Sequence, residues 1–105
     1  MAKKVVEINI SGKKKNLKLG FNALIELEEA LGKPLASFGE ETPSLSDMRT
    51  IFHIALQHGG ENKVTLEGAG EYIDDIIGEN GIEYFSEKIA EVMQVSIGKN
   101  NLPSQ

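Results

Sequence analysis

The sequence predicts a mainly helical α+β fold, with an N-terminal β-hairpin followed by about four amphipathic helices. Apolar and polar residues alternate with a period of two near the N-terminus. From Gly20 onward, apolar residues recur instead at spacings of three and four, which is the helical period. Glycine, proline and helix-capping residues separate these segments and set the predicted boundaries of the elements.

The hairpin is predicted from two short alternating segments, residues 4–10 and 16–19. The apolar residues that share one side are Val6, Ile8 and Ile10 in the first segment and Leu17 and Leu19 in the second. Ser11-Gly12-Lys13 breaks the alternation, and Gly12 can adopt the positive φ of a tight reversal. A two-stranded hairpin is marginal alone in water, so we expect it to pack on the helices or to join a partner's sheet.

The first helix is predicted over residues 21–31. Its apolar stripe is formed by Phe21, Leu24, Leu27 and Leu31, beside a row of glutamates. Gly32 supplies the C-terminal stop, and Pro34 keeps the helix from continuing. Residues 35–45 are predicted to form a loop with room for one short turn at 35–38.

Three further amphipathic helices follow, each bounded by a capping residue or a glycine-containing turn. Their predicted bounds are Ser44 or Ser46 to Gly59-Gly60, Thr65 to Asn80-Gly81, and residues 82–97. Their predicted inward residues are Leu45, Met48, Ile51, Phe52, Ala55 and Leu56, then Leu66, Ala69, Ile73, Ile76 and Ile77, then Ile82, Phe85, Ile89, Val92, Met93 and Ile97. Because glycine weakens a helix by about 1 kcal/mol relative to alanine, we expect Gly68 and Gly70 to let another backbone come close or to leave the first turn loose.

The length and composition indicate one domain, because 105 residues with 40% hydrophobic and 26% charged residues can bury one core. We expect the domain to cover residues 1–98, with the hairpin in 1–19, the helices in 20–98 and a flexible tail at 99–105. The absence of cysteine excludes disulfides, thiolate metal sites and cysteine nucleophiles, and fits a reducing compartment. No segment reads as a signal peptide or an apolar span, so the expected location is the cytoplasm.

The formal charge of −5 is distributed unevenly along the chain. Residues 1–18 hold six lysines against one glutamate, whereas residues 19–105 hold five basic and fifteen acidic residues, a net charge of −10. Nucleic-acid binding requires a positive field over a whole face, which an acidic body opposes. We therefore interpret Lys13-Lys14-Lys15 as a solvated turn, and the acidic surface as maintaining solubility or complementing a basic partner.

No combination of residues in the sequence indicates catalysis, a metal site or a cofactor site. His53 and His58 are five residues apart, whereas joint ligation from one helix requires a spacing of four, so we expect one partly buried and one helix-terminal histidine. The third helix carries an acidic stripe, formed by Glu67, Glu71, Asp74 and Asp75. A hard-cation site needs about six converging oxygens, which a stripe on one helix does not supply. We therefore expect a protein that is not an enzyme and that binds no cofactor or metal.

Three segments of the chain form an ordered set. The first is residues 19–35, in which a phenylalanine-containing helix ends in Leu-Glu-Glu-x-Leu-Gly. The second is residues 48–56, which follow an Arg-x-Ile-Phe-x-x-Ala-Leu arrangement, and the third places Val-Thr-Leu-Glu at 64–67 before the acidic helix at 73–77. In this order the segments resemble the tail assembly chaperones of long-tailed, siphovirus-type phages and prophages. The resemblance spans residues 5–95 in order and length.

The resemblance implies a small non-catalytic factor that acts in the host cytoplasm during tail building and is absent from the mature virion. It implies binding to the tape-measure protein, the tail tube protein or both, and a possible homo-oligomer. An apolar groove would cover the exposed seams of a long helical tape measure, and the hairpin edge could add to the sheet of a tube subunit. The residues expected to bind these partners are Phe21, Leu24, Glu28, Met48, Phe52, Glu71 and Asp75.

The competing function is that of a small regulatory or nucleic-acid-binding protein of a mobile element, with the second and third helices as a helix-turn-helix. Against it, the presumed recognition helix is acidic and residues 64–87 contain no arginine or lysine that could contact phosphate or guanine. An enzyme subunit is a third class, and it would require a pocket of converging polar groups.

Overall fold

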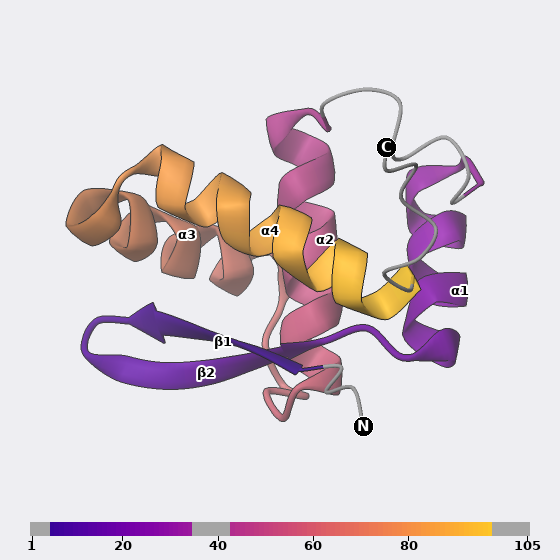
Figure 1. Cartoon of the computed structure of the whole chain (residues 1–105), viewed down its shortest axis with the longest axis horizontal. Coiled ribbons are helices and arrows are strands. Elements are labelled where there is room, and N and C mark those ends of the chain that lie inside the picture. The colour runs from indigo at the N-terminus through magenta and orange to yellow at the C-terminus, as the bar shows by residue number, and fades with distance from the viewer. Residues whose placement is uncertain (1–4, 35–42, 98–105) are drawn as a thin grey trace.

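A computed structural model describes the protein over residues 5–34 and 43–97. The elements in chain order are β1 (Val5–Ile10), β2 (Lys13–Lys18), α1 (Phe21–Leu31), α2 (Leu45–His58), α3 (Leu66–Asn80) and α4 (Ile82–Ile97) (Figure 1). The predicted mainly helical α+β fold with an N-terminal hairpin and four helices is confirmed. The turn predicted at 35–38 and the tail predicted at 99–105 lie outside the described residues.

Helix α2 lies at the centre of the fold, in contact with β2, α1, α3 and α4. Figure 1 shows α1 at one end of the molecule and the turn between α3 and α4 at the other. The hairpin lies against α3 and α4 through β1, and against α2 through β2. The hairpin is therefore covered on one face by this chain's own helices, as its marginal stability in isolation requires.

The hairpin turn is tighter than the sequence predicts. Val5 pairs with Lys18 and Ile10 pairs with Lys13, so the loop consists only of Ser11 and Gly12. Both have positive φ, 53° and 80°, as in the two-residue turns whose twist matches that of the flanking strands. The prediction that Lys13-Lys14-Lys15 forms a turn is therefore wrong, because the two-residue loop lets these lysines enter β2 at once.

The two faces of the hairpin differ as the alternation predicts. Val6, Ile8, Ile10, Leu17 and the following Leu19 are buried, while the odd-numbered positions of β1 are exposed. Each strand therefore contributes its apolar side to the core, and the polar side remains in contact with solvent.

The first two helices begin and end where local chemistry favours it. Helix α1 ends at Gly32, whose φ of 72° is left-handed. Ser44, rather than Ser46, caps α2, because its hydroxyl oxygen accepts a 3.1 Å hydrogen bond from the backbone amide of Asp47. Helix α2 ends at Gly59, as predicted.

The capped start of α3 corrects the prediction for its two glycines. Thr65 accepts a 2.9 Å hydrogen bond from the amide of Gly68, so the first turn is held and not loose. A Cβ on Gly68 would lie 3.2 Å from the Thr65 hydroxyl, and a Cβ on Gly70 would lie 3.6 Å from Cδ of Arg49. Neither neighbour is a backbone atom, so no second backbone approaches these glycines closely.

The core joins the hairpin to all four helices. At its centre the rings of Phe52 and Phe85 pack edge to face, with centroids 5.4 Å apart and planes at 79°. Among the residues of the predicted apolar stripes, Leu24, Leu27, Ile51 and Phe52 are buried, and Leu31, Ile73 and Ile77 are partly buried against the core. Nothing is described of the side chain of Ile97, which is also predicted to face inward.

Three predicted inward residues lie largely at the surface instead. Leu45, Leu66 and Ile82 are 66%, 38% and 46% exposed, respectively. Each is the first residue of its helix, so its position on the apolar stripe extends past the end of the core. The apolar stripes of α2, α3 and α4 are therefore longer than the surface that the described chain covers.

Candidate functional site

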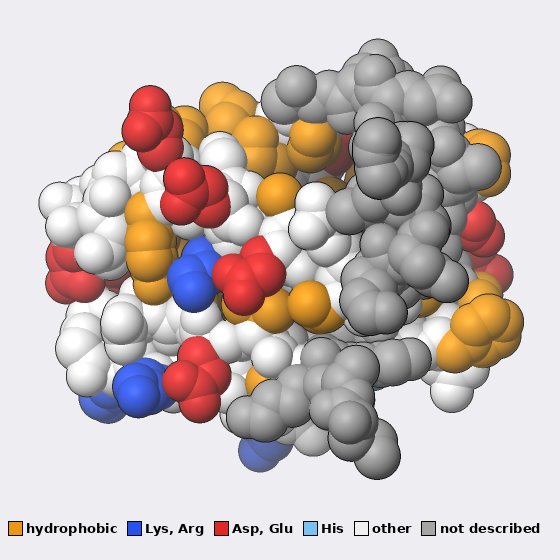
Figure 2. Space-filling model, viewed as in Figure 1, with side chains coloured by type: hydrophobic (Ala, Val, Ile, Leu, Met, Phe, Trp, Pro, Cys, Tyr) orange, Lys and Arg blue, Asp and Glu red, His pale blue; other side chains and the backbone are white. Residues whose placement is uncertain are grey.

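An open apolar groove lies where the start of α2 meets α3 and the start of α4. It encloses about 350 Å³, and its lining residues are Leu45, Ser46, Arg49, Gly70, Ile73, Ile77, Ile82 and Phe85. In Figure 2, hydrophobic side chains (orange) lie beside acidic ones (red) at the upper left of the molecule, near the starts of α2 and α4. Phe85 is fully buried and belongs to the floor, whereas Leu45 and Ile82 are exposed and belong to the rim.

The sequence builds this groove through three local features. Gly81, with a φ of 92°, reverses the chain after α3 and lets α4 fold back on it. On α3, Ile73 and Ile77 are one turn apart, so both point to the same side. On α2, Leu45 and Arg49 are spaced in the same way along the first turn after the Ser44 cap.

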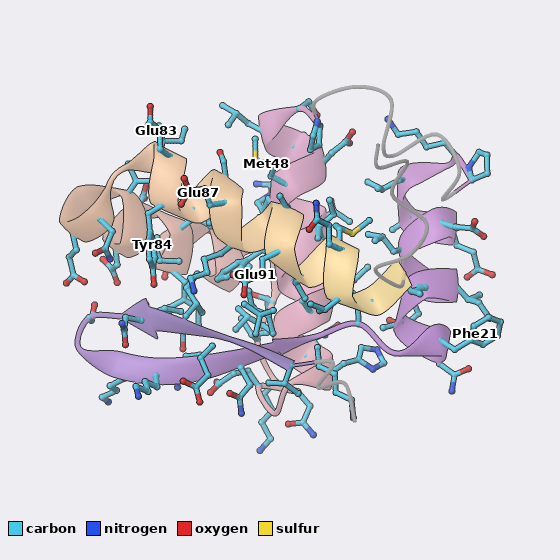
Figure 3. All side chains as sticks on the ribbon, viewed as in Figure 1. Phe21, Met48, Glu83, Tyr84, Glu87 and Glu91 are labelled. Atoms are coloured by element: carbon cyan, nitrogen blue, oxygen red, sulfur yellow. The ribbon has the colours of Figure 1, made fainter. Side chains whose placement is uncertain are left out.

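The charges around the groove are mostly negative and lack ion-pair partners within the described residues. Asp74 is one turn from both Gly70 and Ile77, and Glu67 is one turn before Gly70, on the same side of α3 as Asp74. Glu83 follows Ile82 at the start of α4. Figure 3 shows Glu87 and Glu91 farther along that helix, beyond the groove, and Glu91 pairs with Lys88 at 3.7 Å. The single arginine of the sequence, Arg49, supplies the one positive charge among the residues that line the groove.

Three of the seven residues predicted to bind a partner lie in the core. Leu24, Met48 and Phe52 are buried, so their side chains do not reach a partner while this fold is intact. All three also belong to the apolar stripes predicted to face inward, and their burial is confirmed. The reason is that the middle parts of the α1 and α2 stripes pack against each other, and α2 also packs against β2, so these three side chains are covered.

The other four predicted residues are at least partly accessible but do not form one patch. Phe21, at the start of α1, is 77% exposed, and Figure 3 shows it at the far end of the molecule from the turn between α3 and α4. Glu28 is half-buried on the same helix. Glu71 and Asp75 are exposed on α3, where Asp75 accepts a 3.3 Å hydrogen bond from the Ser11 hydroxyl.

None of the residues that line the groove is among the seven predicted to bind a partner. The apolar members are predicted for the core, because an apolar stripe does not show which of its residues the fold will cover. One indication was available in the sequence. Leu45 and Ile82 are the first residues of their helices, so they lie beyond the parts of those helices that other elements cover.

The two histidines make contacts between segments of the fold that are distant in sequence. His53 donates a 2.9 Å hydrogen bond from Nε2 to the carbonyl of Val64, and His58 at the end of α2 lies 3.3 Å from Glu26 on α1. No group of three or more potential metal ligands lies together within residues 5–34 and 43–97. None of the helices in those ranges is both long and apolar enough to cross a bilayer.

No protein-family model, curated protein or solved structure matches the chain.

Proposed function

We propose that the protein is a phage or prophage tail assembly chaperone, which binds the tape-measure protein, the tail tube protein or both during tail morphogenesis. The observation that carries the proposal is the ordered resemblance of three segments across residues 5–95. These segments correspond to α1, α2 and the start and middle of α3, so the resemblance follows the helical order of the fold.

The groove supports the proposal because it suits the expected partner. A tape measure is a long helical chain with apolar seams, and such a seam needs an apolar channel to cover it before the tail is assembled. Leu45, Ile73, Ile77 and Ile82 offer such a channel without opening the core. The surrounding carboxylates keep the complex hydrated. At a pH above the isoelectric point of about 5.0 their negative charge also opposes non-specific aggregation.

The hairpin offers a second, smaller contact for a tube subunit. The amide of Asn9 on β1 bonds to Tyr84, so the outward amides left on this strand are those of Val5 and Glu7. A short strand of a tube subunit could pair there by β-augmentation. The chaperone would act in the host cytoplasm and would not remain in the mature virion.

Co-expression with tail proteins of the same phage or prophage tests this function. We expect the tagged chain to retain a tape-measure fragment or the tube protein in a pull-down, and to run larger than 11.4 kDa in gel filtration. A chain that stays strictly monomeric and retains neither tail protein would overturn the proposal.

The alternative of a nucleic-acid-binding regulator is disfavoured by the exposed face of α3. Glu67, Glu71 and Asp74 are exposed there and have no ion-pair partner among the described residues, so this helix would repel phosphate. We expect no retarded band in a gel shift at physiological salt. A dissociation constant in the low micromolar range or tighter would restore this alternative.

A further inference from the structure

The groove is apolar, open and unfilled by the described chain. Leu45 and Ile82 stand 66% and 46% exposed at its rim, and Ile73 and Ile77 are only partly buried between them. These four side chains come from three different helices yet face one channel. Covering them would remove apolar surface from water without any rearrangement of the core.

The charges beside the groove specify what can cover it. Glu67 and Asp74 lie on one side of α3, along one edge of its wall, and Glu83 follows Ile82 at its α4 end. None of the three has an ion-pair partner in the described ranges. Only Arg49 opposes them, and it too lacks a carboxylate partner there. The rim therefore carries a net negative charge, within a body whose residues 19–105 sum to −10. Such a rim attracts a cationic occupant and repels an acidic one.

We propose that the groove binds a basic amphipathic helix, with the apolar ridge of that helix on Leu45, Ile73, Ile77 and Ile82 and its lysines or arginines beside Glu67, Asp74 and Glu83. In the context of the proposed chaperone function, on which this assignment to a tail protein rests, the helix belongs to the tape measure. Groove recognition of this kind reads apolar residues at spacings of three and four, and flanking charges set which helices are accepted.

Arg49 gives the proposal a test that can increase affinity. Its stem packs beside Gly70, with Cδ 3.6 Å from the position of a Cβ there, so its charge stands next to the path of the occupant. A positive charge at this place opposes a cationic helix. Arg49→Gln keeps most of the stem and removes the charge, so binding should become about twofold tighter.

The first experiment uses the full chain and two synthetic probes. Both are amphipathic helices of about 18 residues, or five turns, with leucines on one face, and the remaining positions are lysine in one probe and glutamate in the other. We expect fluorescence anisotropy to show binding of the lysine probe and not of the glutamate probe. The affinity for the lysine probe should fall as the salt concentration is raised. Equal binding of both probes would overturn the proposal.

Matched variants locate the binding. Ile82→Gln should weaken binding of the lysine probe about tenfold. Ile25→Gln, at a 40% exposed isoleucine on α1, should leave that binding unchanged. Asp74→Lys should weaken it about fivefold, whereas Glu29→Lys, the same charge change on exposed α1, should have much less effect. Equal losses within either pair would place the probe elsewhere and overturn the proposal.

The pull-down with the tape-measure fragment separates the two proposals. If the unmodified protein and Ile25→Gln retain the fragment but Ile82→Gln does not, the result supports both the chaperone function and the groove as its site. Retention that survives Ile82→Gln and Asp74→Lys leaves the chaperone function standing and overturns the groove as its site. If the protein does not retain the fragment, while the variants change the affinity for the lysine probe as expected, the chaperone function is overturned and the groove remains a site for basic helices.

Discussion

The hydroxyl of Tyr84 on α4 lies 3.3 Å from the backbone amide of Asn9 on β1 and accepts its hydrogen bond. An unpaired strand edge is a template for adding another strand, and here a helix occupies part of that edge. Ser11 adds two further contacts at the same end of the hairpin, to Glu79 and Asp75 on α3. The hairpin is thus fastened to the α3 and α4 pair by side chains that the apolar pattern does not reveal.

Removing the Tyr84 hydroxyl should loosen this edge. We expect Tyr84→Phe to lower the free energy of unfolding by about 1 kcal/mol, the usual contribution of one hydrogen bond, and to speed hydrogen exchange at the Asn9 amide. Tyr72→Phe is the control, because no hydrogen bond to that hydroxyl is described. Exchange at Asn9 that does not differ between the two variants would contradict the role assigned to Tyr84.

The end of α2 touches β2 at a position that only glycine can occupy. A Cβ on Gly59 would collide with the backbone carbonyl of Asn16, although the φ of Gly59, −91°, is open to any residue. The constraint is therefore steric and not conformational. A backbone atom cannot move aside as the end of a flexible side chain can, so the strand or the helix would have to shift.

Two alanine substitutions test this contact. We expect Gly59→Ala to destabilise the protein by about 2 kcal/mol, as overpacking does. Gly78→Ala, within α3 and with no atom within 4 Å of its Cβ, should instead stabilise by up to about 1 kcal/mol through helix propensity. Chemical denaturation measures both, and a stable Gly59→Ala protein would show that the hairpin and α2 are not held this closely.

Much of the fold follows from local sequence. The bounds of α1, the Thr65 cap and the buried sides of both strands are set by residues within one or two turns, and these predictions are confirmed. The two-residue loop at Ser11 and Gly12 was missed because serine seldom adopts positive φ. Likewise, the close approach predicted at Gly68 or Gly70 occurs at Gly59, where two elements distant in sequence meet.

The candidate site was harder to predict because exposure is a tertiary property. Phe52 and Phe21 both lie on apolar stripes, yet the first is fully buried and the second is 77% exposed. Leu45 and Ile82 also lie on apolar stripes, so the pattern predicts both to face inward, although both are exposed. Only the packing of α3 and α4 against the start of α2 decides which stripe residues remain open.

The two phenylalanines provide a matched test of that packing. We expect Phe52→Ala to cost about 3–5 kcal/mol, because it leaves a cavity and removes the edge-to-face contact with Phe85. Phe21→Ala should change the free energy of unfolding by less than about 0.5 kcal/mol, as most surface substitutions do. Thermal melting compares the two, and similar melting temperatures would mean that the register of α2 is wrong.

The connection between α2 and α3 is held to the hairpin by an ion pair. Nζ of Lys15 on β2 donates a 2.7 Å hydrogen bond to the carboxylate of Glu61, and both side chains are largely shielded from solvent. This bond, aided by the negative charge of Glu61, raises the pKa of Lys15 above its ordinary value of 10.5, against the opposing effect of burial. Lys15 precedes Asn16, whose backbone carbonyl meets Gly59, so the ion pair and this close contact join neighbouring residues in the middle of β2 to the end of α2 and the chain that follows it.

The raised pKa of Lys15 predicts how stability changes in alkaline solution. The folded state binds the proton more tightly than the unfolded state, so this stabilisation is fully present below pH 10.5 and is lost as the pH rises through the folded-state pKa. Glu61→Gln should lower stability at pH 8, and the difference from the unmodified protein should shrink above pH 10.5. Lys63→Gln, which has no described ion pair, serves as the control. Urea unfolding across this range measures the effect, and a difference between Glu61→Gln and the unmodified protein that stays constant with pH would show that the ion pair does not stabilise the fold.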